Sequence, residues 1–243
     1  FSTNNQAQNP LMNDPFFRRF FQDRPGQDRP QSQTPRKRRQ SAGSGVIIDA
    51  EKGIIMTNHH VIKNSDEVRV SLVDGREFIA EVKGVDPELD IAILHIDAKN
   101  LAEVRLGDSN KLDVGDFVVA IGNPFGLGQT VTTGIVSALG RTGLGIEGYE
   151  NFIQTDASIN PGNSGGALVR LNGELIGINT AIIAPSGGNV GIGFAIPVNM
   201  AKASMEQILA TGEVKRGQLG VSIQDITPEL REAFDLKNGQ QGV

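Results

Sequence analysis

A short glycine-rich segment, Gly162-Asn163-Ser164-Gly165-Gly166, contains the residue types needed for nucleophilic catalysis. Acyl transfer without a metal requires a nucleophile, a base that deprotonates it and donors that stabilise the oxyanion. Glycines permit a tight turn that aims the N–H groups of Gly162 and Ser164 at one point beside the Ser164 hydroxyl. The segment therefore predicts a serine nucleophile with an adjacent oxyanion hole, although an ordinary glycine-rich turn has the same composition.

Two adjacent histidines, His59 and His60, follow the apolar segment Ile54-Ile55-Met56. A strand end can present an imidazole to a cleft, and a neutral imidazole is the natural base for a hydroxyl near pH 7. Residue chemistry alone leaves open which of the two is the base, and a single histidine is often structural. The third histidine, His95, alternates with apolar residues in a strand pattern, so we expect it on the surface.

The carboxylate of Asp90 precedes the apolar run Ile91-Ala92-Ile93-Leu94. A carboxylate at the entry to a buried strand is unfavourable unless a donor or a positive charge meets it, and the Nδ1–H group of a histidine is such a donor. The other interpretation is a turn aspartate, such as Asp86 or Asp97. The chain order histidine, aspartate, serine is that of chymotrypsin-like enzymes and differs from the α/β-hydrolase and subtilisin orders.

Short strands must position these residues, and the sequence predicts them from Gly43 onwards. Apolar runs bounded by Gly, Asp and Asn are typical of strands. A first set, expected to form one barrel, covers residues 46–48, 54–56, 68–72, 78–85 and 91–96. A second set, expected to form another, covers residues 117–121, 130–139, 152–155, 167–169, 175–183 and 193–196. Pro197 then opens a helical pattern through Ile208, with Gly212 as its expected stop. Beyond it we expect a strand at residues 217–221 and a short helix at residues 228–234.

The overall composition narrows the class of protein. The 30 glycines, the absence of Trp and the frequent short Val/Ile runs favour an all-β protein. A net charge of −5 provides no global basic field, which argues against nucleic acid as a partner. Without Cys there is no disulfide, thiolate metal site or cysteine nucleophile. The sequence has no Walker-type loop, no signal-peptide pattern and no apolar run of the roughly 18 residues that a transmembrane helix needs.

Residues 1–42 are rich in Gln, Asn, Pro and Arg, and they predict a loop segment. One apolar face would form there if Pro15 opens a short helix, and it consists of Phe16, Phe17, Phe20 and Phe21. That face would pack either on its own domain or on another subunit. The basic run at residues 36–39 is expected to be solvated loop. Because the chain begins at Phe1 rather than Met, we expect a processed or trimmed product.

Five segments combine the candidate residues with distinctive neighbours. They are Thr57-Asn58-His59-His60-Val61, Asp90-Ile91-Ala92-Ile93-Leu94, Gly122-Asn123-Pro124-Phe125-Gly126, Gln154-Thr155-Asp156-Ala157 and Gly162-Asn163-Ser164-Gly165-Gly166. Together they closely resemble the HtrA family of proteases, nearest to its bacterial DegP/DegQ type. The resemblance implies a chymotrypsin-like fold of two six-stranded β-barrels with a C-terminal helix. In that family the second position of the histidine pair is the catalytic base, which selects His60 over His59 and gives a triad of His60, Asp90 and Ser164.

The resemblance also implies which residues meet the substrate. For the oxyanion hole these are Gly162, Asn163 and Ser164; Ile159 and Ile182 line the primary pocket, and Thr180 is a further substrate-binding residue. At the base of that pocket, six residues before the nucleophile, stands Ser158 rather than an acid. A pocket without a carboxylate does not favour Lys or Arg, so we expect it to accept Val, Ala, Ile or Leu. Such residues are buried in folded proteins and exposed in unfolded ones.

The function implied by the resemblance is that of an ATP-independent serine endopeptidase of protein quality control, which degrades unfolded or damaged proteins without a metal or a cofactor. The alternative is a chaperone-like module that holds unfolded chains without cutting them. The family also implies homotrimers or multiples of three and a periplasmic location. We expect a loop segment at residues 1–42, a protease domain at 43–212 and, at 213–243, a linker with the truncated start of a PDZ domain. The first barrel is expected to lack one strand.

Overall fold

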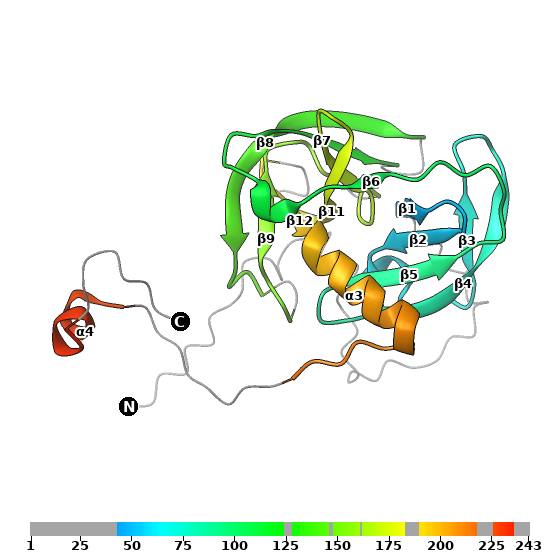
Figure 1. Cartoon of the computed structure of the whole chain (residues 1–243). Coiled ribbons are helices and arrows are strands. Elements are labelled where there is room, and N and C mark those ends of the chain that lie inside the picture. Colours follow the sequence, from blue (N-terminus) through cyan, green and yellow to red (C-terminus); the bar gives the residue numbers. More distant parts are fainter. Residues whose placement is uncertain are drawn as a thin grey trace, which may run out of the picture.

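The computed structural model describes residues 43–123, 128–145, 148–160, 162–182, 190–217 and 226–235. Strands dominate these residues, so the expected all-β, chymotrypsin-like class is confirmed. Figure 1 shows two β units side by side, with the long helix α3 lying across both of them. The predicted phenylalanine cluster at residues 16–21 and the predicted strand at 217–221 lie outside the described residues, apart from Gly217.

The first unit is an open, antiparallel half-barrel with the strand order β1-β2-β5-β4-β3. Its strands are β1 (Val46–Asp49), β2 (Ile54–Thr57), β3 (Val68–Ser71), β4 (Glu77–Asp86) and β5 (Ile91–His95). Within the described residues this sheet has five strands and stays open between β1 and β3. Strand β2 and most of the central strand β5 are buried on both faces.

The second unit is a closed barrel. Its strands are β6 (Arg105–Leu106), β7 (Phe117–Gly122), β8 (Thr130–Arg141), β9 (Phe152–Thr155), β10 (Ala167–Arg170), β11 (Glu174–Ile182) and β12 (Gly193–Pro197). In this 7-stranded sheet the order is β10-β7-β8-β9-β12-β11-β6, and the pairing of β10 with β11 closes the ring. Strand β6 adds to β11 in parallel outside that ring. Closure removes the unpaired edges that an open sheet would expose.

Alternating burial along β7 shows how the sequence closes the second barrel. Val118, Ala120 and Gly122 are buried, whereas Phe117 is 64% exposed. Since strand side chains point alternately to opposite faces, the buried set faces the barrel interior. There it joins a core of small and branched side chains from the neighbouring strands, comprising Leu112, Val136, Ile153, Ala157, Ile159, Leu168, Ile176 and Ala195.

Helix α3 (Val198–Thr211) ties the two units together. Its buried face recurs every three to four residues and consists of Val198, Ala201, Ser204, Met205 and Ile208. This face packs on β4 and β5 of the half-barrel and on β11 and β12 of the closed barrel. The helix ends at Gly212, as the sequence predicts, because Gly212 adopts a left-handed φ of 81° and its N–H bonds to the Ile208 carbonyl.

A short helix, α4 (Pro228–Ala233), follows near the end of the described residues. It lies where the sequence predicts a helix, and its N-cap Thr227 accepts a hydrogen bond from the Leu230 N–H group. Within the part of the chain that the structure covers, no helix combines the length and apolar character needed to cross a membrane.

Candidate functional site

Three loops at the junction of the two units carry the predicted catalytic residues. His60 lies in α2 (His59–Ile62), a single turn that follows Asn58 at the end of β2. Asp90 ends the turn between β4 and β5, and Ser164 lies in the loop between β9 and β10. Asp90 and Ser164 are 2% and 5% exposed, so each polar side chain needs a partner inside the protein.

His60 and Asp90 are joined by two hydrogen bonds. The Nδ1 atom of His60 lies 2.6 Å from Oδ2 of Asp90. The backbone N–H of His60 donates to the other carboxylate oxygen, Oδ1, over 2.8 Å. A carboxylate held in this way fixes the orientation of the imidazole ring and favours the tautomer with its proton on Nδ1. The arrangement leaves Nε2 as the atom that can act as a base.

The backbone of Asp90 is adapted to this contact. Its φ is 56°, in the left-handed region that a residue with a Cβ rarely adopts, although Asp and Asn tolerate it best. The Asp90 carbonyl accepts hydrogen bonds from the side-chain amide of Asn58 at 2.9 Å and from the His59 N–H at 3.2 Å. These bonds to the segment that carries His60 hold the unusual turn in place.

Thr180 connects this pair to Ser164. Its hydroxyl donates to Oδ2 of Asp90 over 2.9 Å, and its carbonyl accepts the Ser164 hydroxyl over 3.1 Å. Thr180 itself is 3% exposed. The resemblance implies that Thr180 binds substrate, and in the structure its side-chain hydroxyl is directed at Asp90. The structure thus brings His60, Asp90, Thr180 and Ser164 into one hydrogen-bonded group.

The Ser164 loop needs glycine at two positions. Gly162 and Gly165 adopt φ values of 99° and 83°, which favour glycine. A Cβ on Gly165 would stand 2.2 Å from the Ser44 carbonyl oxygen and 2.3 Å from Oγ1 of Thr57. Backbone bonds then fix the turn, among them Gly165 N–H to the Asn179 carbonyl at 2.8 Å. The glycine-rich motif is therefore required by close packing on the strand that leads to His60.

The other two histidines lie in different environments. Burial lowers the pKa of His59, while the charge of Asp90 acts in the opposite direction. Among the described residues, His59 contacts Asp90 through its backbone N–H group, which donates to the Asp90 carbonyl. His95 lies on β5 with its Nδ1 3.7 Å from a carboxylate oxygen of Glu81, and its side chain is 34% exposed. Of the three, His60 has the geometry of an oriented base.

An ion pair with a buried carboxylate supports the turn that carries Asp90. Asp86 is completely buried at the end of β4 and receives Nη1 of Arg216 at 2.6 Å and the hydroxyl of Ser204 at 2.6 Å. Burial raises the pKa of Asp86, but the hydrogen bonds from Arg216 and Ser204 and the charge of Arg216 outweigh it, so the pKa is lowered overall. The Arg216 guanidinium also lies over the ring of Tyr149, 4.9 Å from its centroid.

The predicted specificity residues lie in the closed barrel. Ile159 is 1% exposed, belongs to the barrel core and packs against Gly193, where a Cβ would stand 2.9 Å from its Cδ1. Ser158 is partly buried, and its carbonyl accepts the Thr132 hydroxyl at 2.8 Å. Ile182 ends β11, but its side chain lies outside the described part of the structure. Within the described residues, no group of three or more His, Cys, Asp and Glu side chains could hold a metal ion.

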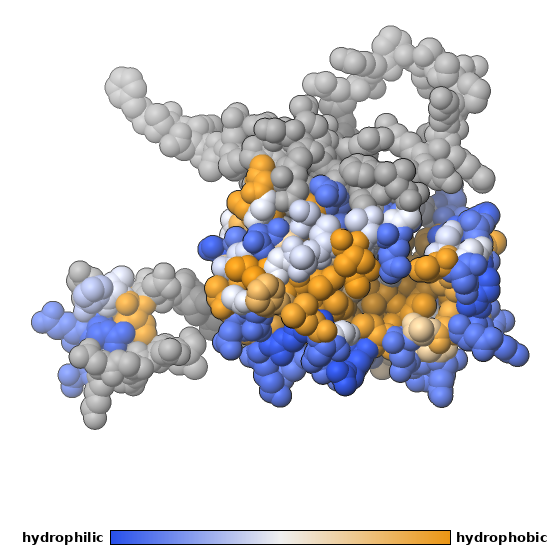
Figure 2. Space-filling model, turned by 90° about the horizontal axis from the view of Figure 1, so that it is seen from above, coloured by the Kyte–Doolittle hydropathy of each residue, from blue (hydrophilic) through white to orange (hydrophobic). Residues whose placement is uncertain are grey.

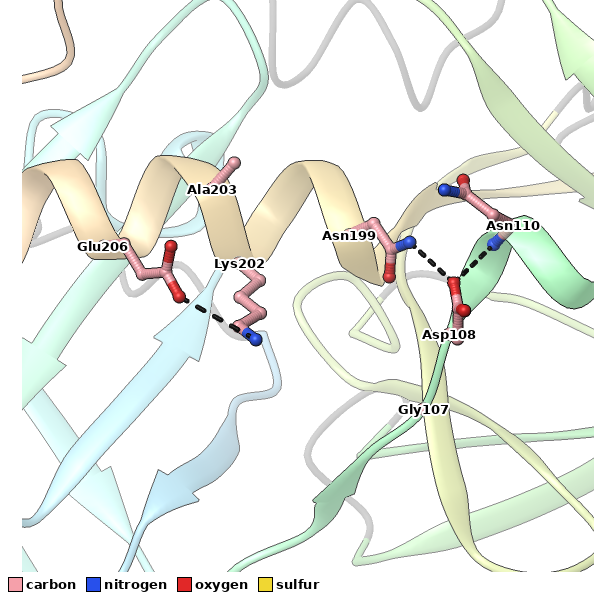
Figure 3. Close-up of a pocket in the computed structure, with 7 residues that line it drawn as sticks. All are labelled: Gly107, Asp108, Asn110, Asn199, Lys202, Ala203 and Glu206. Atoms are coloured by element: carbon pink, nitrogen blue, oxygen red, sulfur yellow. Dashed lines mark hydrogen bonds and ion pairs between the residues drawn. The ribbon is translucent and has the colours of Figure 1, made fainter.

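A separate polar depression of about 470 Å³ lies beside the start of α3. Figure 3 shows Asp108 accepting from the Asn199 amide, at 2.8 Å, and from the Asn110 N–H, at 3.1 Å. On the same helix Lys202 pairs with Glu206 at 3.8 Å. His60, Asp90 and Ser164 are not among its lining residues. This depression is therefore separate from the Ser164 cluster.

The fold and the hydrogen-bonded group define a protein of the trypsin-like peptidase class. The family described as trypsin-like peptidase domain matches residues 43–178, and the solved structures that the chain resembles include HtrA-type proteases. The chain belongs to the trypsin-like peptidase family and, within it, to the HtrA-type serine proteases.

Three comparisons show how close the similarity is. The chain is 61% identical over 201 residues to the periplasmic serine endoprotease DegP of Salmonella typhimurium, covering 82% of this chain and 42% of that protein. It is 56% identical over 221 residues to the periplasmic pH-dependent serine endoprotease DegQ of Escherichia coli, covering 90% and 47%. A structure of the HtrA-type protease AlgW with a decapeptide superimposes with a TM-score of 0.72 at 57% identity, covering 80% and 59%. The chain thus spans less than half the length of these curated relatives.

Proposed function

We propose that the chain is an ATP-independent serine endopeptidase of protein quality control, with His60, Asp90 and Ser164 as its catalytic triad. The observation that carries the proposal is the 2.6 Å contact between Nδ1 of His60 and the buried Asp90 carboxylate, joined through Thr180 to Ser164. Further support comes from the names of the relatives, which are serine endoproteases. The same names describe these relatives as periplasmic, so the proposed location of this chain is the periplasm.

In the proposed reaction the Ser164 oxygen attacks the substrate carbonyl carbon while Nε2 of His60 takes the hydroxyl proton. The backbone N–H groups of Gly162 and Ser164 stabilise the negative oxygen, whereas the N–H of Asn163, which the resemblance also includes in the oxyanion hole, donates to the Asn160 carbonyl. His60 returns its proton to the leaving amine as the C–N bond breaks, which leaves an acyl-enzyme. Water then gives a proton to His60 as its oxygen attacks the ester, and Ser164 is protonated again when the acid leaves. Asp90 stays ionised throughout and holds the imidazolium.

Hydrolysis of an unfolded protein tests this proposal directly. We expect casein to be cleaved by the chain without ATP, and the Ser164→Ala variant to leave it intact. The rival function, holding unfolded chains without cutting them, predicts binding of casein by both proteins and cleavage by neither. Fragment analysis by gel and mass spectrometry separates the two, since only the peptidase produces fragments that depend on Ser164.

The proposed primary pocket accepts short apolar residues. The support is the uncharged Ser158 and the apolar Ile159, which lies in the barrel core beneath Gly193. Mass spectrometry of casein fragments should show cleavage mainly after Val, Ala, Ile or Leu. Because Ile159 is already closely packed, enlarging it would also strain the core, so the sharper variant is Ile182→Phe. It should shift cleavage towards Ala.

A matched control for that variant is Leu209→Phe, which enlarges a side chain that is 45% exposed on α3. Its cleavage pattern should equal that of the parent chain. Predominant cleavage after Lys or Arg would show that the pocket is assigned wrongly, and an unchanged pattern in Ile182→Phe would remove Ile182 from its wall.

The proposed assembly is a homotrimer or a multiple of three. Figure 2 shows apolar surface gathered on the face seen from above, which includes the side of β7 and β8. On these strands Phe117 and Val131 are 64% and 61% exposed. Apolar surface of this kind is typical of contact regions between subunits. Self-association would cover this apolar surface. The surface and the phenylalanine-rich segment predicted at residues 16–21 together support the proposed assembly.

Light scattering after size-exclusion chromatography checks the assembly at several concentrations. The mass should correspond to three subunits or a multiple of three. Replacing Phe16, Phe17, Phe20 and Phe21 together by Ser should shift larger assemblies towards smaller ones. A monomer at every concentration, with the same mass in the variant, would mean that the phenylalanines pack on their own domain.

A further inference from the structure

Every polar group of Ser44 is bonded to a segment of the candidate site. Its N–H donates to the Ser164 carbonyl at 2.8 Å, and its hydroxyl donates to the Gly162 carbonyl at 2.6 Å. The same hydroxyl accepts the Asn123 N–H at 2.8 Å, and the Ser44 carbonyl accepts the Thr57 hydroxyl at 2.6 Å. Ser44 lies just before β1, far along the chain from the loop that it holds.

We propose that Ser44 is a positioning residue that holds the Ser164 loop in its reactive shape and fixes it relative to the strand that leads to His60. The proposal rests on the proposed function, since it concerns the same catalytic group. Ser44 is not expected to touch the substrate. It acts through the carbonyls of Gly162 and Ser164, the two residues whose N–H groups are the main candidates for the oxyanion hole.

The loop depends on such an anchor because glycine does not restrict its own backbone. Gly162 has a φ of 99° and no side chain that could lock this conformation. Its neighbour Asn163 is fixed through its N–H, which donates to the Asn160 carbonyl at 2.9 Å. The hydroxyl and N–H of Ser44 donate to the carbonyls of Gly162 and Ser164, which flank Asn163. A rotation of this loop must therefore break a hydrogen bond to Ser44 or to Asn160.

The same residue links the nucleophile to the base. Thr57 is 2% exposed, ends β2 and precedes His60 by three residues. Through its hydroxyl bond to the Ser44 carbonyl, the end of β2 and the Ser164 loop share one anchor. The space between them is full, because a Cβ on Gly165 would stand only 2.2 Å from the Ser44 carbonyl oxygen. A misplacement of this loop would therefore alter both the oxyanion donors and the approach of the hydroxyl to His60.

Removing only the Ser44 hydroxyl isolates this role. In Ser44→Ala the backbone bonds to Ser164 and Thr57 remain, whereas the Gly162 carbonyl and the Asn123 N–H lose their partner. Loss of a complete oxyanion donor lowers kcat by roughly 100-fold to 1,000-fold in a serine protease, so loosening the loop should lower it by about 10-fold to 100-fold. KM for a peptide substrate should change less than about threefold, because ground-state binding uses other contacts.

The experiment compares the parent chain with Ser44→Ala, Ser44→Thr and the matched control Ser71→Ala. Ser71 ends β3 in the half-barrel, and its hydroxyl is exposed and contacts Glu77 at 3.2 Å. Thermal unfolding checks that all four proteins fold. Ser44→Thr keeps the hydroxyl and should recover most of the lost kcat, while Ser71→Ala should match the parent. A kcat within twofold of the parent in Ser44→Ala, or no recovery in Ser44→Thr, would overturn the proposal.

Amide hydrogen exchange of the peptide that covers residues 160–168 gives a readout that does not need activity. Exchange should be at least about tenfold faster in Ser44→Ala than in the parent or in Ser71→Ala, because local opening of the loop becomes easier. If the parent chain does not cleave casein, the proposed function fails, and the exchange measurement alone decides the role of Ser44. If casein is cleaved and exchange is unchanged, only the Ser44 proposal fails.

Discussion

Replacing Ser164 or His60 by Ala is expected to lower kcat/KM for peptide cleavage by about 10⁴-fold or more, with the fold intact. The reason is that each replacement removes a group that must move a proton or form the covalent bond. His60 has its Nδ1 held 2.6 Å from the Asp90 carboxylate, so its replacement removes an oriented imidazole. Steady-state cleavage of a fluorogenic peptide measures the effect, and circular dichroism confirms folding.

The neighbouring histidine provides the matched control for this prediction. His59→Ala should keep activity within about tenfold of the parent chain, because the described His59 contact to Asp90 uses its backbone N–H, which Ala retains. Near-complete loss of activity in His59→Ala combined with normal turnover in His60→Ala would show that the base is assigned to the wrong residue.

The second large effect concerns stability. Asp86→Ala should lower the free energy of unfolding by about 2–4 kcal/mol, because it leaves the buried Ser204 hydroxyl without its acceptor and Arg216, whose side chain is 27% exposed, without its partner. Urea unfolding measures the change. A matched control is Asp74→Ala, which removes an exposed carboxylate paired with Arg76 and should alter stability little. Equal stability of the two variants would contradict a structural role for the Asp86 pair.

The lowered pKa of the Asp86 carboxylate predicts that the free energy of unfolding depends on pH. Its pKa in the folded chain lies below the value of about 3.9 that an unfolded Asp has. The folded state therefore gains stability from the ionised carboxylate above that value, and the gain is lost as the pH falls through the folded pKa. The stability difference between the parent and Asp86→Asn should be constant near neutral pH and shrink below about pH 4. A difference that widens on acidification would refute the sign of this shift.

Local pattern was sufficient to locate most of the strands, and the structure brings the predicted His60, Asp90 and Ser164 into one hydrogen-bonded group. The predicted strand at 152–155 coincides with β9, and the predicted strand at 54–56 differs from β2 by only Thr57. The short strand β6 and the single turn α2 were not predicted, because two to four residues do not establish a period. The helical pattern from Pro197 through Ile208, with Gly212 as its predicted stop, corresponds to α3, which has Pro197 as its N-cap and extends to Thr211.

The supporting contacts of the site could not be predicted, because they join residues far apart in the chain. Ser44 and Gly162 are 118 residues apart, and so are Asp86 and Ser204. No local period relates such pairs, and their side chains are ordinary at the sequence level. Thr180 illustrates the same limit, because the resemblance placed it among the substrate-binding residues and only the fold reveals its hydroxyl on Asp90.

Covalent labelling with a fluorophosphonate tests the central claim most directly, because this reagent reacts with a serine that is activated by an oriented base. After digestion, mass spectrometry should find one phosphonyl group per chain, on the peptide that contains Ser164. Labelling and casein cleavage should be lost together as the reagent is titrated, and His60→Ala should not be labelled. Cleavage of casein that persists in a fully labelled chain, or a label on a serine other than Ser164, would contradict the account.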